Sequence, residues 1–310
     1  MALKADYIYN ANGVNVRTKI IPDGTTWKND KAARACGFKA GDLYKAQRRL
    51  CGTGKPAWIT IHNTAAVAGV QDCAELYTRA TYNETMGAAR VHFYVDAHGA
   101  WQNLKAGTGM FPGDPINSAE VGWHAGDSSV SNGGNETSVG IEVIMGANSL
   151  DDSKAKDNAA RLVAWLLRKY GLHDDKVVSH TYWVNNKAGK RFDDVDEQST
   201  NPIYGQKWCP VYIFGSTNKT VANTNWKAFK SLVWEYYAKI MRDKIRPLAV
   251  GDKVRLKETA TVYGTTRKFA AFVYKSPLYV RAIVQDRAVV SVLASGAITG
   301  AVQVSQLIKI

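Results

Sequence analysis

The sequence predicts an α/β domain followed by a small all-β barrel, and three observations lead to this prediction. Between residues 57 and 245, short runs rich in β-branched and aromatic residues alternate with long stretches of helical periodicity. The pattern changes around Pro247 and Gly251, which both interrupt regular structure. Short β-rich runs without helical periodicity follow, as in a small barrel. We therefore expect one domain over residues 1–245 and a second over residues 246–310.

The first 56 residues are polar and carry turn signals such as "IPDGTTW" and "CGTGKP". We expect them to form a loop-rich N-terminal extension, an added lobe over the sheet, for which the residues indicate no function. The stretch "CGTGKP" is not a phosphate-binding loop, because Pro56 stands where that motif requires Ser or Thr.

Buried strands are predicted where apolar runs are short. "WITI" leads directly into His62, and "VVS" leads directly into His180. Residues 91–104 predict two strands around a tight turn at His98-Gly99. "SVGIEVIM", residues 138–145, predicts another buried strand, although it contains an acidic residue.

Two helices are predicted by apolar residues that recur at spacings of three and four. The first spans residues 152–171, where Asp152 or Ser153 can cap the start and Gly171 can cap the end. The second covers roughly residues 223–243.

The second predicted domain is both β-rich and basic. From residue 250 onward it has nine Lys or Arg residues and three acidic residues, a net charge of +6. Its β-rich runs are residues 253–258, 269–274, 278–284, 288–293 and 300–309.

The whole chain has a formal net charge of +13, which favours an anionic partner such as nucleic acid, an acidic membrane face or an anionic cell-wall polymer. A soluble surface that happens to be basic is the plain alternative. Long runs of Lys and Arg are missing, and the largest cluster is "QRRL"; this argues against nucleic acid, which usually selects a basic stripe or arm.

The sequence contains no apolar run near the roughly 20 residues that a membrane helix needs. Its first residues, "MALKADYIYN", do not combine a basic stretch with an apolar one, as secretory signals do. We therefore expect a protein made in a cytoplasm without a signal peptide, with no membrane partner.

Three residues could together bind a metal. His62 and His180 each follow a predicted strand, at the rim of a sheet where sites form, and Cys209 could join them. Two imidazoles, a thiolate and one open position make a known arrangement for catalytic zinc. Each residue also has a structural interpretation: a lone His is more often a hydrogen-bonded structural residue, and a lone Cys is more often packed in a core.

Glu142 is unusual because an acid inside a buried strand is costly to leave unpaired. It could lie on an exposed strand face or pair with Arg. The functional alternative is a general base whose pKa is tuned by apolar surroundings. Lys207, two residues before Cys209, could be its electrostatic counterpart.

Six motifs occur in order, and together they resemble the zinc-dependent N-acetylmuramoyl-L-alanine amidases, above all those of phage endolysins, which are relatives of the peptidoglycan-recognition-protein fold. The motifs are "ITIHNTA", "HFYVDAHGAW", "GWHAGD", "SVGIEVI", "VVSH" and "KWCP". The resemblance covers residues 57–245 and implies a central mixed sheet flanked by helices.

This resemblance implies a role for each matching residue. It implies Zn²⁺ bound by His62, His180 and Cys209, with Glu142 as the general base and Lys207 beside the reacting carbonyl. The residues that it implies for substrate binding are Asn63, Thr64, His92, Trp123 and His124.

The chain departs from the amidase family in two segments. A third segment, the tail, resembles a different family. Residues 185–205 lengthen the usual gap between the second His and the Cys, and residues 1–56 exceed what the family needs. The tail, through "VGDKVRLKETATVYG" and "GAVQVSQLIK", is similar to bacterial SH3-like wall-binding modules.

We therefore expect an endolysin, a monomer, that hydrolyses the amide between N-acetylmuramic acid and L-alanine in anionic Gram-positive peptidoglycan and acts on the wall after release. The alternatives are a peptidoglycan-recognition protein that binds without cleaving, and a basic nucleic-acid-binding protein. Both leave Glu142 and the paired histidines without a role.

Overall fold

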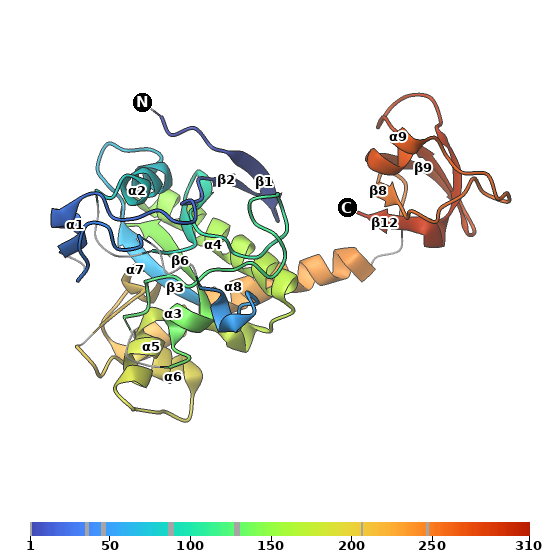
Figure 1. The fold of residues 1–310 in the computed structure, drawn as a ribbon. Helices are drawn as coiled ribbons and strands as arrows, with labels where there is room; N and C mark the ends of the chain where they lie inside the picture. The colour runs from blue at the N-terminus through green and yellow to red at the C-terminus, as the bar shows by residue number, and fades with distance from the viewer. Residues whose placement is uncertain are drawn as a thin grey trace. The chain divides into compact units, whose positions relative to one another are not determined.

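The structure is a computed structural model that describes residues 2–34, 37–44, 48–85, 90–126, 131–205, 207–245 and 248–310. The chain divides into two compact units, residues 1–239 and residues 240–310 (Figure 1). The division falls inside the last long helix of the first unit, slightly before the predicted boundary at residue 245. Pro247, which contributed to that prediction, lies outside the described residues.

A mixed seven-stranded sheet forms the centre of the first unit, as expected, and helices flank it (Figure 1). The strand order is β1-β2-β5-β4-β6-β3-β7. The parallel pairs β4·β6, β6·β3 and β3·β7 lie together at one side of the sheet. The strands are β1 (Tyr7–Ala11), β2 (Val14–Thr18), β3 (Trp58–Ala65), β4 (Phe93–Asp96), β5 (Gly99–Gln102), β6 (Ser138–Met145) and β7 (Val177–Ser179).

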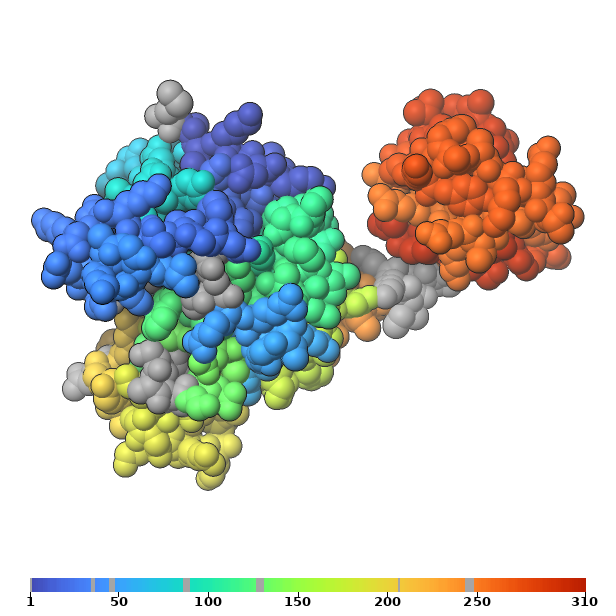
Figure 2. Space-filling model, viewed as in Figure 1, coloured from blue at the N-terminus to red at the C-terminus, as the bar shows by residue number. Residues whose placement is uncertain are grey.

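The expectation of a loop-rich extension is wrong for the beginning of the chain. β1 and β2 form a hairpin, and β2 continues the central sheet by pairing in parallel with β5. Asn12 and Gly13 both have positive φ, 54° and 89°, as a two-residue hairpin turn requires. Tyr9 and Val16 point into the core, so the hairpin alternates as a half-buried strand pair should. On the face shown in Figure 2, the N-terminal residues in blue form a continuous part of this unit's surface.

The helices pack their apolar residues on the sheet. α2 places Cys73 and Ala74 in one buried cluster with Tyr94, Trp101 and Ile144, whereas α4 lies against β4 and β6. The helical segments of the first unit are α1 (Asp30–Arg34), η1 (Leu50–Gly52), α2 (Cys73–Tyr82), α3 (Gly134–Thr137), α4 (Ser149–Tyr170), η2 (Asp174–Lys176), α5 (His180–Lys187), α6 (Val195–Thr200), α7 (Val211–Phe214) and α8 (Lys219–Ile245).

Both predicted long helices exist, with starts a few residues earlier than expected. Asn148 caps α4 by accepting hydrogen bonds from the backbone N–H groups of Leu150 and Asp151, so the cap is neither Asp152 nor Ser153. Gly171 ends α4 in the left-handed conformation, as predicted.

The polar segment 185–205 has more structure than its composition indicates. Buried Asn185 donates through Nδ2 to the carbonyls of Gln198 (2.5 Å) and Asn201 (2.7 Å), and its Oδ1 accepts from Ile203 N (2.9 Å). One side chain therefore connects α5 with α6 and with the residues that follow α6.

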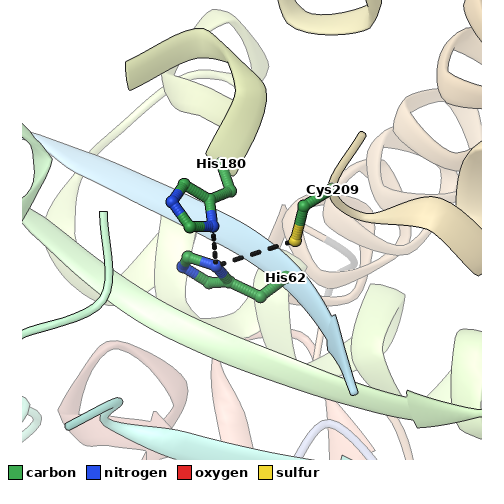
Figure 3. Close-up of side chains that lie close together, drawn as sticks. All are labelled: His62, His180 and Cys209. Atoms are coloured by element: carbon green, nitrogen blue, oxygen red, sulfur yellow. Dashed lines mark hydrogen bonds between the residues drawn. The ribbon is translucent and has the colours of Figure 1, made fainter. Parts of the chain in front are cut away.

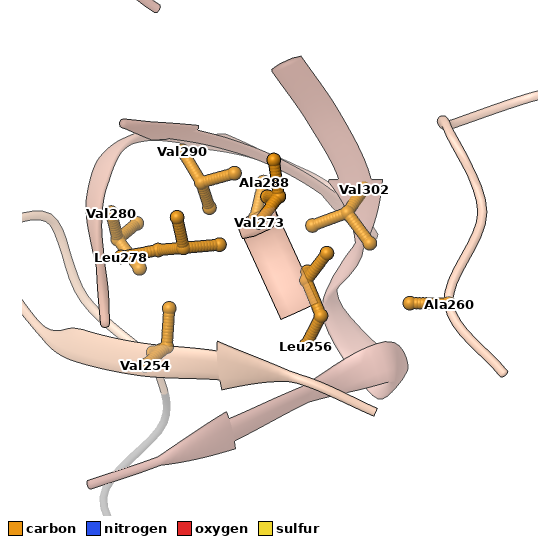
Figure 4. Packing of buried hydrophobic residues seen from close by; sticks show 9 residues of the cluster. All are labelled: Val254, Leu256, Ala260, Val273, Leu278, Val280, Ala288, Val290 and Val302. Atoms are coloured by element: carbon orange, nitrogen blue, oxygen red, sulfur yellow. The ribbon is translucent and has the colours of Figure 1, made fainter. Parts of the chain in front are cut away.

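The second unit contains a five-stranded antiparallel sheet in the order β11-β10-β9-β8-β12. Figure 4 shows its small aliphatic core, in which Leu278, Val290 and Val302 are fully buried. Its elements are β8 (Lys253–Leu256), α9 (Ala271–Lys275), β9 (Leu278–Val284), β10 (Arg287–Ser291), β11 (Gly300–Gln303), η3 (Val304–Gln306) and β12 (Leu307–Lys309).

One predicted strand of this unit is wrong. The run 269–274 contributes to a short helix, α9, rather than to a strand. Val273 enters the core while Phe272 is 60% exposed, so the apolar run does not bury one alternating face.

Within the part of the chain that the structure describes, no helix is long and apolar enough to cross a membrane.

Candidate metal centre

The strand register brings His62 and His180 together. β3 and β7 are parallel, and Ile61 pairs with Ser179, so the next residue of each strand, His62 and His180, lies at the same level. His180 is the first residue of α5, and the Ser179 hydroxyl caps that helix by accepting from Tyr182 N. The chain thus turns from strand to helix at this candidate ligand.

Thr181 ties the third candidate ligand to this strand end. Its hydroxyl donates to the carbonyl of Lys207 (2.6 Å) and accepts from Cys209 N (3.2 Å), while its own backbone N–H donates to the Cys209 carbonyl (3.2 Å). These bonds span the insertion between α5 and Cys209. They place Cys209 beside His180 although 28 residues separate Thr181 from Cys209.

Asn63 fixes the other side of the cysteine loop. Its Oδ1 accepts from the backbone N–H groups of Tyr212 and Ile213 (both 3.0 Å), at the start of α7, and its Nδ2 donates to Val143 O (2.8 Å). The side chain next to His62 therefore joins β3, β6 and α7. The structure shows these contacts for Asn63, whose substrate-binding role stays a prediction.

The three side chains converge, as Figure 3 shows, with His62 on β3, His180 at the start of α5 and Cys209 on the loop. The Nδ1 atoms of His62 and His180 are 3.1 Å apart, and Cys209 Sγ lies 4.0 Å from His62 Nδ1. All three donor atoms lie within 4.8 Å of one another.

This donor set fits zinc. With usual bond lengths, a tetrahedral zinc ion separates two nitrogen ligands by about 3.3 Å and a nitrogen from a sulfur by about 3.6 Å. The observed separations are close to both values. Two imidazoles and one thiol also leave a fourth position open, as catalytic zinc sites do.

His62 and His180 are in the neutral state that metal binding requires. Burial, with smaller effects from neighbouring cationic groups, holds the pKa of His62 well below its usual value and lowers the pKa of His180 to about 3. Both rings are therefore neutral and offer a lone pair. Burial, and next the negative charge of Glu142, raises the pKa of Cys209 to about 12, so a metal must displace the thiol proton on binding.

Glu142 faces the same side of the sheet as His62, because the two residues are paired in the β3–β6 register. Its Oε2 is buried and has no hydrogen-bond partner among the described residues. Burial raises the pKa of Glu142 from its ordinary value of 4.5 to about 7, and the positive charge of Lys207 opposes this shift. A carboxylate in this state can accept a proton near neutral pH.

The other predicted site residues occupy different depths. Lys207 is exposed, Thr64 and Trp123 are half-buried, and the side chains of His92 and His124 are almost fully buried. Trp123 packs edge-on against Phe38. His92 accepts from Gly140 N through Nδ1 (3.0 Å) and donates through Nε2 to Glu120 O (2.8 Å), so both ring nitrogens are engaged within the protein.

Thr181 is the residue at this site that sequence reasoning missed. Its position directly after a candidate ligand is visible in "VVSHT", but its partners are backbone groups 26 and 28 residues away. Every residue has the same backbone groups, so the sequence does not indicate which of them Thr181 contacts. This set of hydrogen bonds, which we call the Thr181 clamp, becomes visible only in the structure.

Residues 52–211 match the family described as N-acetylmuramoyl-L-alanine amidase. The matched range contains all five candidate metal and catalytic residues and excludes the second unit.

Two amidases of Bacillus subtilis (strain 168) are similar to the chain. N-acetylmuramoyl-L-alanine amidase XlyA is 34% identical over 139 residues, which are 45% of this chain and 41% of that protein. N-acetylmuramoyl-L-alanine amidase CwlH is 34% identical over 140 residues, 45% of this chain and 49% of that protein. The chain therefore spans less than half the length of each of these relatives.

Among solved structures, the catalytic domain of XlyA is 26% identical, with a TM-score of 0.45, over 71% of this chain and 99% of that one. Staphylococcus aureus hydrolase AmiA is 18% identical, with a TM-score of 0.42, over 77% of this chain and 87% of that one.

Proposed function

The chain belongs to the N-acetylmuramoyl-L-alanine amidase family, and from this premise we propose that its first unit is a zinc-dependent peptidoglycan hydrolase. It cleaves the amide between the lactyl group of N-acetylmuramic acid and L-alanine. The observation that carries this proposal is the convergence of His62, His180 and Cys209 at one strand end, with Glu142 on the same face of the sheet.

The residues divide the reaction between them. His62, His180 and Cys209 would hold the zinc ion, which supplies Lewis acidity to a water molecule and to the carbonyl of the scissile amide. Glu142 takes a proton from the attacking water as the new C–O bond forms. It then gives this proton to the amine nitrogen, and the amide C–N bond breaks. Lys207, exposed at the rim, stabilises the negative charge that develops on the carbonyl oxygen.

A protein that only recognised peptidoglycan would have no use for this arrangement. Oε2 of Glu142 is buried without a hydrogen-bond partner among the described residues, which is costly, and the raised pKa of Glu142 suits proton transfer rather than binding. We therefore assign the site to catalysis.

For the second unit we propose wall binding by an SH3-like module. Its support is the small five-stranded antiparallel sheet and the net charge of +6 from residue 250 onward. A basic module favours the anionic polymers of a Gram-positive wall, and it should do so in a salt-dependent manner.

The deciding experiment measures zinc content and product chemistry together. Purified protein is incubated with Gram-positive walls, and new N-terminal alanine is quantified alongside bound metal. We expect one zinc ion per chain and release of N-terminal alanine that stops after chelation and returns when zinc is added back. New reducing sugar ends without new N-terminal alanine would assign the cleavage to a different bond. Binding to walls without any product would replace the hydrolase with a recognition protein.

A further inference from the structure

The ring of His124 lies between a metal-ligand candidate and a backbone carbonyl. Its Nδ1 is 3.0 Å from Nε2 of His62, and its Nε2 is 3.3 Å from the carbonyl oxygen of Ser138. The two imidazole rings meet edge to face, at an interplanar angle of 89°. Each ring nitrogen of His124 therefore has one defined neighbour.

The carbonyl fixes the direction of the hydrogen bonds. A carbonyl oxygen can only accept, so the proton of a neutral His124 belongs on Nε2, where it is donated to Ser138. Nδ1 of His124 is then an acceptor, and the hydrogen bond between the rings requires the proton on Nε2 of His62. This leaves Nδ1 of His62 with a free lone pair, and that atom faces His180 and Cys209.

The opposite arrangement is unfavourable on both sides. If His124 carried its proton on Nδ1, its bare Nε2 would face the lone pairs of the Ser138 carbonyl. His62 would then carry its proton on Nδ1, directed at the other two ligand candidates. That tautomer cannot coordinate a metal through Nδ1.

The surroundings hold the His124 ring in one place. A Cβ atom added at Gly140 would come within 2.7 Å of the ring, and one added at Gly122 within 2.8 Å, so both glycines make room for it. The backbone beside the ring is anchored as well, because Asn135 Oδ1 accepts from the N–H groups of His124 and Ala125 (both 2.8 Å). The ring is thus positioned before any metal arrives.

We propose that His124 is a positioning residue that holds His62 in the tautomer able to bind zinc through Nδ1. This inference rests on the proposed zinc site. It also gives His124 a task different from the substrate contact expected from sequence. Groups that orient a metal-binding histidine typically contribute 10–100-fold to metal affinity.

Two substitutions at His124 separate the hydrogen-bond acceptor from the bulk of the ring. His124→Asn keeps an acceptor, because Asn Oδ1 is as many bonds from Cα as Nδ1 of His. His124→Leu fills similar space without any acceptor. His173→Leu is the matched control, since this exposed histidine lies beside Asp174 and Asp175 and could bind zinc adventitiously.

Zinc affinity is measured by competition with a chromophoric chelator, and folding by thermal unfolding of the metal-free proteins. We expect His124→Leu to bind zinc about 10–100-fold more weakly, and His124→Asn and His173→Leu to stay near wild type. Wild-type affinity in His124→Leu would overturn the inference. Equal weakening in His124→Leu and His124→Asn would also overturn it, because the acceptor would then not be the cause.

The tautomer itself is read from long-range ¹H–¹⁵N spectra of the metal-free wild-type protein, labelled at its six histidines and assigned with His62→Asn. We expect the Nε2–H form of His62. This measurement tests the proposed tautomer even if His124→Leu does not fold. An Nδ1–H form in a protein that binds zinc would overturn the inference alone. A wild-type protein that binds no zinc would overturn the proposed function and the positioning role together.

Discussion

At the scale of single residues, Glu142 shows how burial prepares a group for chemistry. Its carboxylate lies in the β3–β6 register beside His62, and one oxygen has no partner among the residues that the structure describes. The raised pKa that results is a cost to the folded state. Function and stability therefore make opposite demands on this residue, and each demand can be measured.

Glu142→Gln removes the basic carboxylate with almost no change of shape. We expect turnover on walls to fall about 10²–10⁴-fold, the usual contribution of a general acid–base group, while zinc content stays at wild type. Turnover and bound zinc are measured on the same preparation. A loss smaller than tenfold would leave Glu142 a structural role.

The same substitution should stabilise the metal-free protein at high pH. The pKa of Glu142 is about 7 in the folded protein against an ordinary 4.5, so below pH 4.5 the group is protonated in both states and has no effect. Between about pH 4.5 and 7 the unfolded state releases this proton while the folded state keeps it, so the free energy of unfolding falls by up to about 3 kcal/mol and stays at that lower value above pH 7. We expect Glu142→Gln to raise the free energy of unfolding at pH 8 and to leave it unchanged at pH 4, by urea titration. An equal gain at both pH values would exclude the charge as the cause.

Cys209→Ser tests the metal site from the ligand side. A hydroxyl replaces the soft thiolate, and we expect zinc affinity to fall by more than about 100-fold, because even supporting groups contribute 10–100-fold. Cys51→Ser is the control, since Cys51 is an exposed free cysteine. Metal analysis after dialysis gives the result, and full zinc retention in Cys209→Ser would remove Cys209 from the ligand set.

At the scale of elements, the site depends on segments that meet only through hydrogen bonds. The strand end at His180 holds the cysteine loop through Thr181, and β3 holds the start of α7 through Asn63. The insertion between α5 and Cys209 can therefore lengthen the chain without displacing Cys209, the third candidate ligand. The hydrogen bonds of Thr181 and Asn63 hold the cysteine loop in place, as a short connection between His180 and Cys209 would otherwise do.

Thr181→Val tests this clamp, because it removes the hydroxyl and keeps the branched shape. The buried N–H of Cys209 then loses an acceptor, which costs about 1–3 kcal/mol. We expect lower thermal stability, and we expect zinc binding to weaken roughly tenfold, because a loss of about 1.4 kcal/mol corresponds to a factor of ten in affinity. Thr181→Ser keeps the hydroxyl and should behave as wild type in chelator competition. If Val and Ser behave alike, the hydroxyl does not hold the loop.

Sequence patterns predicted those elements whose signal is local. β6 was predicted at its full bounds because apolar residues run through it, and Gly171 marked the end of α4. The β1–β2 hairpin was also accessible, since Asn12-Gly13 stands between alternating residues, but its parallel pairing with β5 leaves no local trace. The convergence of the three candidate ligands was predicted through motif order. The contacts of Thr181 with backbone groups and of His124 with His62 were not, because they join residues far apart in the sequence and leave no local signal.

At the scale of the whole molecule, chemistry and charge are distributed unequally between the two units. All five candidate metal and catalytic residues belong to the first unit, and the segment from residue 250 onward carries +6 of the chain's +13. Each unit also has a buried core of its own. This separation predicts that catalysis and wall binding can be measured apart.

Deleting residues 248–310 should leave a folded unit that cleaves small soluble muropeptides at the wild-type rate. Intact walls should be cut more slowly, because tethering to an immobile polymer raises the local concentration of enzyme. The difference on walls should shrink as salt rises, since screening already weakens the full chain. Sedimentation with walls gives the binding, and unchanged wall affinity would remove the anchoring role. Loss of muropeptide cleavage together with early melting would instead show that the second unit stabilises the first.

The parallel pairing of β2 with β5 has a consequence for synthesis on the ribosome. The hairpin of β1 and β2 emerges before the other strands of the sheet, and it can close locally around Asn12-Gly13. Val16 of the hairpin pairs with Ala100 of β5, which follows it by about 84 residues in the sequence. The nascent hairpin must therefore wait, with one edge unpaired, while the ribosome adds those residues at about 5–20 per second, which takes several seconds. β5 still emerges before β6 and β7, so β2 can join β5 while β3 has none of its partner strands available.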